Sequence, residues 1–194
     1  MKLKIDKEKI NNLSPEDAIP LVVKLSQFIF GKRKPDGFTK IVFSINLFSW
    51  FLLTIWNMIS YFVILSSDII KANKGFSVNA IIRRNGRELG FNEQSFLDTI
   101  TQYYFLNNFI WGIIFIGLVL MYRKSSYYTI FLLGGLIVHF SMMIFMLGLQ
   151  YFIEDVSLFD KILYGVLISL TIIHSFLMKK EKNDLEVENT EEKI

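Results

Sequence analysis

The stretch Ser125–Ile153, SSYYTIFLLGGLIVHFSMMIFMLGLQYFI, contains 29 residues and no Asp, Glu, Lys or Arg. An α-helix rises about 1.5 Å per residue, so about 20 apolar residues are enough to cross the hydrocarbon core of a membrane. A helix of a water-soluble protein would place charged residues on its exposed face, and this stretch has none to place there. It therefore predicts a transmembrane helix at about residues 126–153.

Three further segments also lack charged residues, at Ile41–Ser67, Thr99–Tyr122 and Ile162–Met178. They predict spans at about residues 41–66, 100–122 and 161–178. The predicted fold is therefore an all-α membrane protein, with a bundle of four transmembrane helices over residues 41–178. A basic segment (residues 1–40) precedes the bundle, a loop (67–99) joins the first two spans, and a charged tail (179–194) follows, its first turn continuing the last span.

The basic residues predict the orientation of the bundle. With four spans both termini lie on one side, and that side receives fifteen of the 21 Lys and Arg residues, against six on the other. The positive-inside rule then places both termini in the cytoplasm and the 67–99 loop outside. The first forty residues lack the apolar core and cleavage site of a signal peptide, so the first span is expected to act as the insertion signal.

The N-terminal segment predicts an amphipathic cytoplasmic helix, within SPEDAIPLVVKLSQFIFGKRK (Ser14–Lys34). Ser14 suits the N-cap position of a helix. An apolar face beside Lys32, Arg33 and Lys34 is typical of a helix that lies on the inner leaflet. The alternative is a helix packed under the bundle or against a partner subunit. These three basic residues are the candidate site for docking to a membrane surface or a partner.

The outer loop contains a turn signal. Asn85 and Gly86 form the Asn-Gly dipeptide that favours a two-residue type I′ turn, because both positions need positive φ. The flanking segments Val78–Arg84 and Arg87–Phe91 are therefore predicted to form a small β-hairpin. Asn92 is predicted to cap the helix that leads into the second span.

His139 lies near the middle of the third span, where its ring cannot reach water. A neutral imidazole in hydrocarbon needs a partner for at least its N–H group. One interpretation is an interhelical hydrogen bond, for which Gly135 leaves room for another helix. The other is a pore or switch group, since ionisable residues within membranes often serve ion or proton paths. No Asp or Glu lies in the predicted spans to extend such a path.

Other polar residues in the spans allow the same two interpretations. Asn46 and Asn57 are eleven residues apart and share a helix face, while Asn107 and Asn108 lie near the outer end of the second span. His174 lies near the cytoplasmic end of the fourth span and is expected to be able to snorkel to the surface. Such side chains typically hold helices together by hydrogen bonds, and less often line a polar pore.

The sequence offers no catalytic or cofactor site. There are no cysteines, which excludes thiol nucleophiles, disulfides and Cys-ligated metals. A phosphate-binding glycine loop, an HExxH motif and paired carboxylates within a span are absent, and two histidines 35 residues apart are a poor basis for a metal site. We therefore expect no enzymatic activity, no cofactor and no bound metal.

The layout of a basic lead (Met1–Lys40), four spans, one substantial outer loop (Ser66–Asp98) and a short charged tail resembles the KwaA family, the membrane subunits of the bacterial Kiwa anti-phage system. The resemblance covers the whole chain but rests on no signature residue. It implies a homo-oligomeric sensor of phage attack in the cell inner membrane, in contact with lipid. It further implies a cytoplasmic DNA-binding effector of the KwaB kind as partner, with no direct contact between this chain and nucleic acid.

The resemblance also assigns expected roles to two segments. The outer loop becomes a candidate for sensing or assembly, with Arg83, Arg84, Asn85, Gly86 and Arg87 at its centre. The basic run Lys32–Lys34 becomes the candidate site for docking the effector. A second resemblance, to the small multi-span accessory proteins of type VI-B CRISPR loci, rests on span count and size. A pore-forming channel is the remaining alternative.

Overall fold

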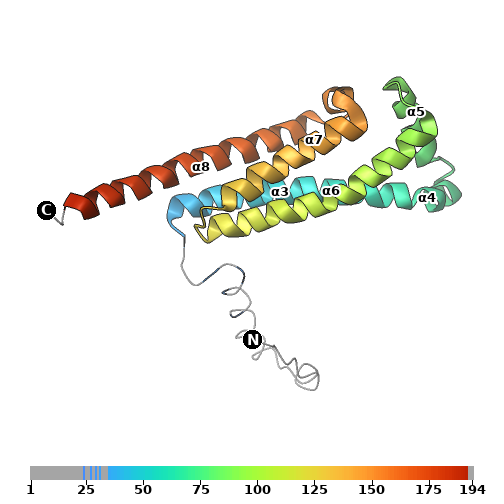
Figure 1. Cartoon of the computed structure of the whole chain (residues 1–194). Coiled ribbons are helices and arrows are strands. Elements are labelled where there is room, and N and C mark those ends of the chain that lie inside the picture. The colour runs from blue at the N-terminus through green and yellow to red at the C-terminus, as the bar shows by residue number, and fades with distance from the viewer. Residues whose placement is uncertain (1–23, 25–26, 28, 30, 32–34, 192–194) are drawn as a thin grey trace, which may run out of the picture.

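The computed structural model describes residues 24, 27, 29, 31 and 35–191 (Figure 1). The predicted N-terminal amphipathic helix and the run Lys32, Arg33 and Lys34 lie outside the described residues. The helices are α3 (Gly37–Leu65), α4 (Ser67–Lys74), α5 (Val78–Glu88), α6 (Glu93–Tyr122), α7 (Tyr128–Glu154) and α8 (Leu158–Glu191). No strand occurs in the described part of the chain.

Four helices are long and apolar enough to cross a membrane, at Gly37–Leu65, Gln94–Tyr122, Tyr128–Glu154 and Leu158–Lys179. The predicted all-α, four-span architecture is therefore confirmed, and the chain is a multi-pass membrane protein. Large apolar side chains cover the outward faces of the bundle; Phe145, for example, is 89% exposed. Water would not tolerate so much apolar surface, whereas lipid tails contact it without cost.

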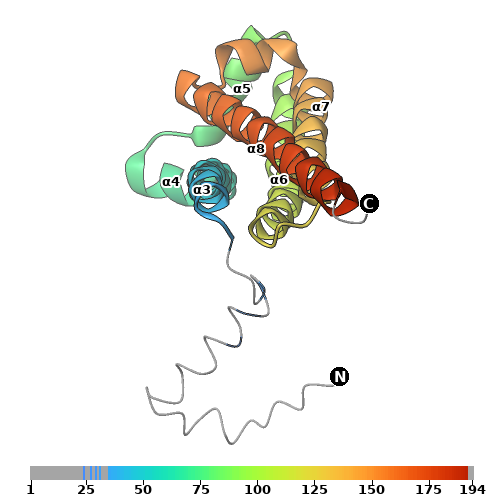
Figure 2. The same ribbon diagram turned by 90° about the vertical axis from the view of Figure 1, so that its left-hand side faces the viewer.

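The four long helices run alternately up and down. α3 packs against α6 and α8, and α7 packs against α6 most extensively and against α8 less so (Figures 1 and 2). One end of the bundle, which we call the α5 end, contains α4, α5 and the α7–α8 turn at residues 155–157. The opposite end, which we call the Asp36 end, contains Asp36 and the α6–α7 turn at residues 123–127.

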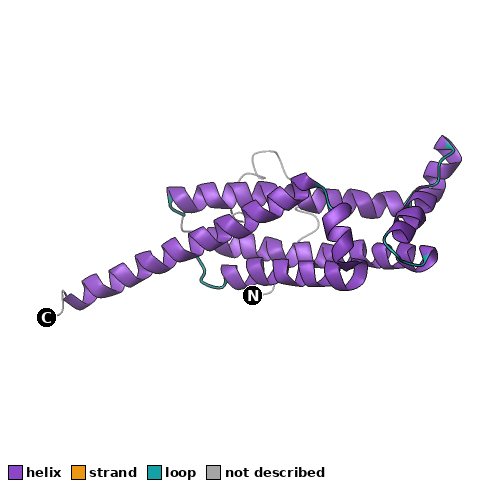
Figure 3. Cartoon of the chain, turned by 90° about the horizontal axis from the view of Figure 1, so that it is seen from above, coloured by secondary structure: helices purple, strands orange, loops and turns teal. Residues whose placement is uncertain are grey.

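The last helix extends well past the bundle at the Asp36 end. α8 runs to Glu191, twelve residues beyond its membrane-spanning part, and protrudes from the other helices (Figures 1 and 3). The tail was predicted to continue the helix for one turn only, so the structure lengthens that helix considerably.

Two glycines let α6 and α7 approach closely. A Cβ added to Gly117 would lie 2.9 Å from the backbone nitrogen of Leu132, and one added to Gly135 would lie 2.7 Å from Cγ1 of Ile114. Gly112 has nothing within 4 Å of such a Cβ. Small residues at helix contacts are what membrane bundles use in place of a hydrophobic driving force.

The predicted β-hairpin in the outer loop is wrong. Asn85 and Gly86 lie within helix α5, whose N-cap Ser77 accepts a hydrogen bond from the backbone N–H of Ala80 (3.3 Å). Gly86 is buried, and a Cβ there would lie 2.5 Å from the ring of Phe96 on α6. This glycine thus serves close packing of α5 on α6 rather than a turn, because tertiary burial outweighs the local turn preference. The predicted Asn92 cap is confirmed: its side chain accepts from the N–H of Gln94 (3.1 Å).

Gly117→Ala is expected to destabilise the bundle, because the new Cβ would crowd the backbone of α7 at Leu132. Overpacking of this kind costs about 1–3 kcal/mol. Gly112→Ala in the same helix is the matched control, since a Cβ there meets no neighbour within 4 Å. Thermal unfolding of both variants in detergent measures the difference. Equal midpoints for the two variants would contradict the close α6–α7 approach.

Candidate functional site

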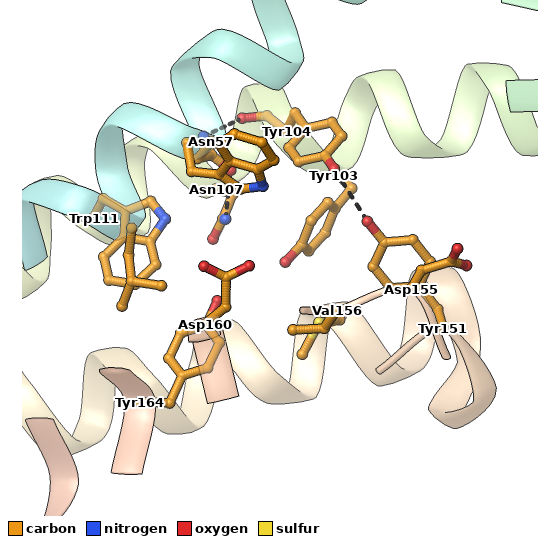
Figure 4. A pocket seen from close by; sticks show the side chains of 13 residues that line it. Asn57, Tyr103, Tyr104, Asn107, Trp111, Tyr151, Asp155, Val156, Asp160 and Tyr164 are labelled. Carbon is orange, nitrogen blue, oxygen red and sulfur yellow. Dashed lines mark hydrogen bonds between the residues drawn. The ribbon is translucent and has the colours of Figure 1, made fainter. Parts of the chain in front are cut away.

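Helix α7 breaks at Gly148, near the α5 end. Gly148 has φ 83° and ψ 157°, a backbone conformation that is open essentially to glycine alone. The residues after the break include Tyr151, whose hydroxyl lies 3.1 Å from the hydroxyl of Tyr104 on α6 (Figure 4). The break thus helps to bring a polar group from α7 into contact with α6.

A chain of hydrogen bonds joins all four spans beside these tyrosines. The backbone carbonyl of Tyr104 can only accept, so the amide nitrogen of Asn57 on α3 donates to it (3.2 Å). The oxygen of Asn57 accepts from the nitrogen of Asn107 on α6 (2.7 Å), and the oxygen of Asn107 accepts from Nδ1–H of His139 on α7 (2.7 Å). Nε2 of neutral His139 is therefore an acceptor, and the hydroxyl of Tyr164 on α8 donates to it (3.0 Å).

The side chains of this hydrogen-bond chain are buried within the bundle. His139 is fully buried, and Asn57 and Asn107 are almost so. Asn108 reinforces the chain, because its side-chain oxygen accepts from Asn57 (2.9 Å) and its nitrogen donates to the Tyr104 carbonyl (3.0 Å). In a membrane interior, burying any of these polar groups without its hydrogen-bond partner would cost free energy. The chain therefore fixes how the four spans meet at this level.

A cavity of about 80 Å³ lies along this chain at the α5 end (Figure 4). Asn57, Asn107 and Tyr164 line it, together with apolar side chains such as Leu53 and Met143. Its lining is otherwise aromatic and acidic: Trp56, Tyr103, Tyr104, Trp111, Tyr151, Tyr164, Asp155 and Asp160. Neither Lys nor Arg is among the described residues that line it.

The two carboxylates give the cavity a negative potential. Asp160 lies in the first turn of α8, where the hydroxyl of Ser157 donates to it (2.8 Å). Asp155 lies in the α7–α8 turn, outside the spans. Burial raises the pKa of Asp155 above its ordinary value, and the negative charges of Glu154 and Glu88 raise it further.

A second polar cluster lies at the Asp36 end. The carboxylate of Asp36 accepts from the hydroxyl of Thr39 (2.6 Å), and Thr39 in turn accepts from Nε2–H of His174 (3.0 Å). Nδ1 of neutral His174 then accepts from the hydroxyl of Tyr128 (2.7 Å). Lys124 in the α6–α7 turn pairs with Asp36 (2.8 Å). His174 is fully buried, so the expectation that it snorkels to the surface is wrong.

Asp36 is strongly acidic in this cluster. Partial burial by itself would raise its pKa, but the hydrogen bonds from Lys124 and from the side chain and backbone of Thr39 outweigh that effect. The pKa of Asp36 consequently lies well below its ordinary value of 3.8. Because Asp36 also caps α3, the same carboxylate stabilises the start of the first span and anchors the α6–α7 turn.

Apolar side chains separate the two clusters. Leu53, Ile114 and Leu167 are buried in the bundle interior between them. Trp50 packs against these residues, and its indole N–H donates to the backbone carbonyl of Trp111 (2.9 Å). A polar path therefore does not run the length of the bundle through these residues.

The structure divides the predicted polar residues into two groups. Asn57, Asn107, Asn108 and His139 come together around the cavity. Asn46 and His174 lie nearer the Asp36 end, where the amide nitrogen of Asn46 donates to Thr171 (3.3 Å). The candidate sensing residues Arg83, Arg84, Asn85, Gly86 and Arg87 lie on α5 and do not line the cavity.

Sequence reasoning missed the aromatic and acidic lining of the cavity. Asp160 and Tyr164 are one helical turn apart on α8, a spacing that places both on one face. The fourth span was predicted from residue 161, which left Asp160 in a loop and hid this relation. Nothing in the sequence singled out Trp111 or Tyr151, because aromatic residues are frequent throughout the spans.

Comparison with known protein families, with curated proteins and with solved structures finds no match to this chain. Within the described residues, no group of three or more His, Cys, Asp or Glu side chains is arranged to hold a metal ion.

Asn107→Leu and His139→Leu are expected to be energetically coupled, because both remove the same 2.7 Å hydrogen bond. Each single variant leaves a buried polar partner unsatisfied, at a cost of about 1–3 kcal/mol. The double variant should lose less stability than the sum of the losses in the two single variants, with a coupling energy of about 0.5–3 kcal/mol. The unfolding free energies of the wild type and the three variants, measured in detergent, give this coupling energy. Asn46→Leu combined with His139→Leu is the control and should be additive, since Asn46 bonds to Thr171 instead.

Asp36→Asn should lower stability at neutral pH, because the amide can still cap α3 but leaves Lys124 without a counter-charge. The native pKa of Asp36 is depressed, so its carboxylate stabilises the fold above the unfolded-state pKa, and this contribution is lost as pH falls toward the native value. The gap in melting temperature between the wild type and Asp36→Asn is therefore expected to be constant near neutral pH and to narrow below about pH 4. A gap that widens in acid would contradict this assignment.

Proposed function

We propose that this chain is a non-enzymatic sensor and scaffold subunit of the cell inner membrane, with both termini in the cytoplasm and the cavity facing outward. In line with its resemblance to the KwaA family, the subunit forms homo-oligomers. It passes a signal of phage attack to a cytoplasmic nucleic-acid-binding effector and does not itself bind nucleic acid.

One observation carries the sensing part of this proposal: the chain Asn57–Asn107–His139–Tyr164 links α3, α6, α7 and α8 at the wall of one cavity. Asn57, Asn107 and Tyr164 line that cavity. A ligand that competes for one of these hydrogen bonds changes the contact between two spans, and the shared side chains connect that contact to the other spans. A protein responds to a ligand through such differential contacts between its conformational states.

The interior of the bundle favours a sensor over a channel. Leu53, Ile114 and Leu167 are buried between the two polar clusters, an apolar composition that does not favour a hydrated path for ions. Polar groups at the two ends instead hold the spans in one arrangement. Signal transfer through a change in helix packing needs no such path.

The Asp36 end supplies features suited to a cytoplasmic partner. α8 protrudes there to Glu191. In the sequence, the basic run Lys32, Arg33 and Lys34 directly precedes the segment that begins α3. A basic run favours a partner surface of opposite charge and contributes mainly to its association rate and specificity. We assign the docking of the effector to this run.

The proposal is tested by purifying the full-length chain from its native host in mild detergent and measuring the intact complex by native mass spectrometry. Lys32, Arg33 and Lys34 are each replaced by Gln in one variant. Lys71 and Lys74, which are exposed at the α5 end, are replaced by Gln in the control. We expect the wild type and the control to retain a soluble protein that binds DNA, and the first variant to lose it while keeping its own oligomeric state.

Reconstituted liposomes provide the opposing measurement. Ion leakage no greater than in protein-free liposomes is expected, both for the wild type and for His139→Leu. A bare oligomer whose ion conductance changes with His139→Leu would contradict the sensor and support the channel. A bare monomer without conductance would contradict both.

A further inference from the structure

We propose that the cavity at the α5 end binds a small ammonium group that carries an oxygen acceptor within a few bonds, the chemistry of ethanolamine. The inference deepens the proposed function and rests on it in treating this cavity as the sensing site. The binding step itself requires only the residues that line the cavity.

The charge of the cavity selects a cation. Asp155 and Asp160 are the charged groups among its described lining residues, and both are acidic. The nearest basic residue in sequence, Lys161, is not among the lining residues: its ammonium donates to the carbonyl of Ile153 (2.8 Å) and lies 5.4 Å from the ring centroid of Phe152. Burial raises the pKa of Asp155, and the negative charges of Glu154 and Glu88 raise it further, in agreement with a negative potential.

The aromatic lining suits an organic ammonium better than a metal ion. Six aromatic side chains surround the cavity, Trp56, Tyr103, Tyr104, Trp111, Tyr151 and Tyr164. The faces of such rings attract ammonium groups, and aromatic cages are a recurrent means of recognising them. A divalent metal would instead need several further oxygen ligands, and the described residues hold no cluster of three or more potential ligands.

A second observation, independent of the charge, requires an oxygen atom in the ligand. The indole nitrogen of Trp111 is buried and has no hydrogen-bond partner, although Trp111 is only 1% exposed. In Figure 4 this nitrogen faces the space between Asn107 and Asp160. An indole N–H can only donate, so a bare cation would leave it unsatisfied, whereas an oxygen beside the ammonium would accept from it.

The size of the cavity limits the ligand to one small group. A volume of about 80 Å³ admits a few heavy atoms, which excludes nucleotides and sugars but not an amino alcohol. Asp155 is exposed at its rim and follows directly after the last residue of a span, at the level expected for lipid headgroups. The same ammonium chemistry is therefore available from two sources, free ethanolamine and the headgroup of phosphatidylethanolamine.

Three ligands of similar size distinguish the contribution of charge to binding from that of the hydrogen bond to Trp111. Full-length chain in amine-free maltoside detergent is titrated with ethanolamine, propylamine and 1-propanol, and binding is followed by calorimetry. Ethanolamine, which offers both groups, is expected to bind most tightly, in the millimolar range. Propylamine lacks the acceptor for Trp111 and should bind about two- to tenfold more weakly. Propanol lacks the charge and should show no saturable binding.

Two variants assign these differences to residues. Asp160→Asn keeps a side chain that accepts from Ser157 but loses the charge, so ethanolamine affinity should fall about tenfold or more. Trp111→Phe keeps a ring and breaks no internal hydrogen bond, and it should abolish the preference for ethanolamine over propylamine. Asp98→Asn, an exposed carboxylate on α6 outside the cavity, is the control and should bind as the wild type does. Thermal unfolding without ligand verifies that each variant is folded.

A second experiment, with lipids, distinguishes free ethanolamine from the headgroup of phosphatidylethanolamine. The chain is placed in nanodiscs of phosphatidylcholine with or without phosphatidylethanolamine, and native mass spectrometry records the lipid that is retained. Selective retention of phosphatidylethanolamine that Asp160→Asn abolishes supports the headgroup, and titratable binding of ethanolamine supports the free amine. Absence of both, equal binding of propanol, or wild-type binding by Asp160→Asn would overturn the inference. Capture of the effector without ligand binding would overturn the inference alone, and ligand binding without an effector would overturn only the proposed function.

Discussion

The backbone carbonyl of Tyr104 sets the direction of the hydrogen bonds that hold the spans together around the cavity. Because it can only accept, it orients Asn57, which orients Asn107, which in turn places the proton of His139 on Nδ1. In water such a network could exchange partners with solvent, but the membrane interior offers no substitutes. One fixed acceptor therefore determines the protonation pattern of a chain that crosses four helices.

The two histidines play the same structural part with opposite tautomers, His139 near the middle of its span and His174 toward the Asp36 end. His139 carries its proton on Nδ1 because Asn107 presents an oxygen to it, whereas His174 carries it on Nε2 because Thr39 is already donating to Asp36. Each ring thus bonds to residues of two other helices. Leu53, Ile114 and Leu167 are buried between the two clusters, which therefore form two separate sets of contacts between the helices.

Several local irregularities coincide at the α5 end, where the cavity lies. Gly148 interrupts α7 near Tyr151, and α8 begins with Asp160 one turn before Tyr164. Gly86 allows α5 to lie flat against Phe96 of α6 at the same end. The Asn-Gly pair, which favours a hairpin in isolation, therefore lies within a helix. Burial of that helix face against α6 contributes more to stability than the local preference for a turn.

The sequence by itself determined that the chain has four membrane-spanning helices, because the absence of charge over some twenty residues is a local property that bilayer thickness converts directly into a span. It also determined that Asn57, Asn107 and His139 need partners, since a buried polar group in hydrocarbon is costly wherever it lies. Only the tertiary structure decided which partners these are. Tyr164 and the Tyr104 carbonyl lie 25 and 47 residues away in sequence from the groups they bind, and the acidic, aromatic cavity has side chains from all four spans. Such a site depends on how the helices are rotated and at what angles they cross. Side-chain packing determines both, and the periodicity of the sequence does not predict them.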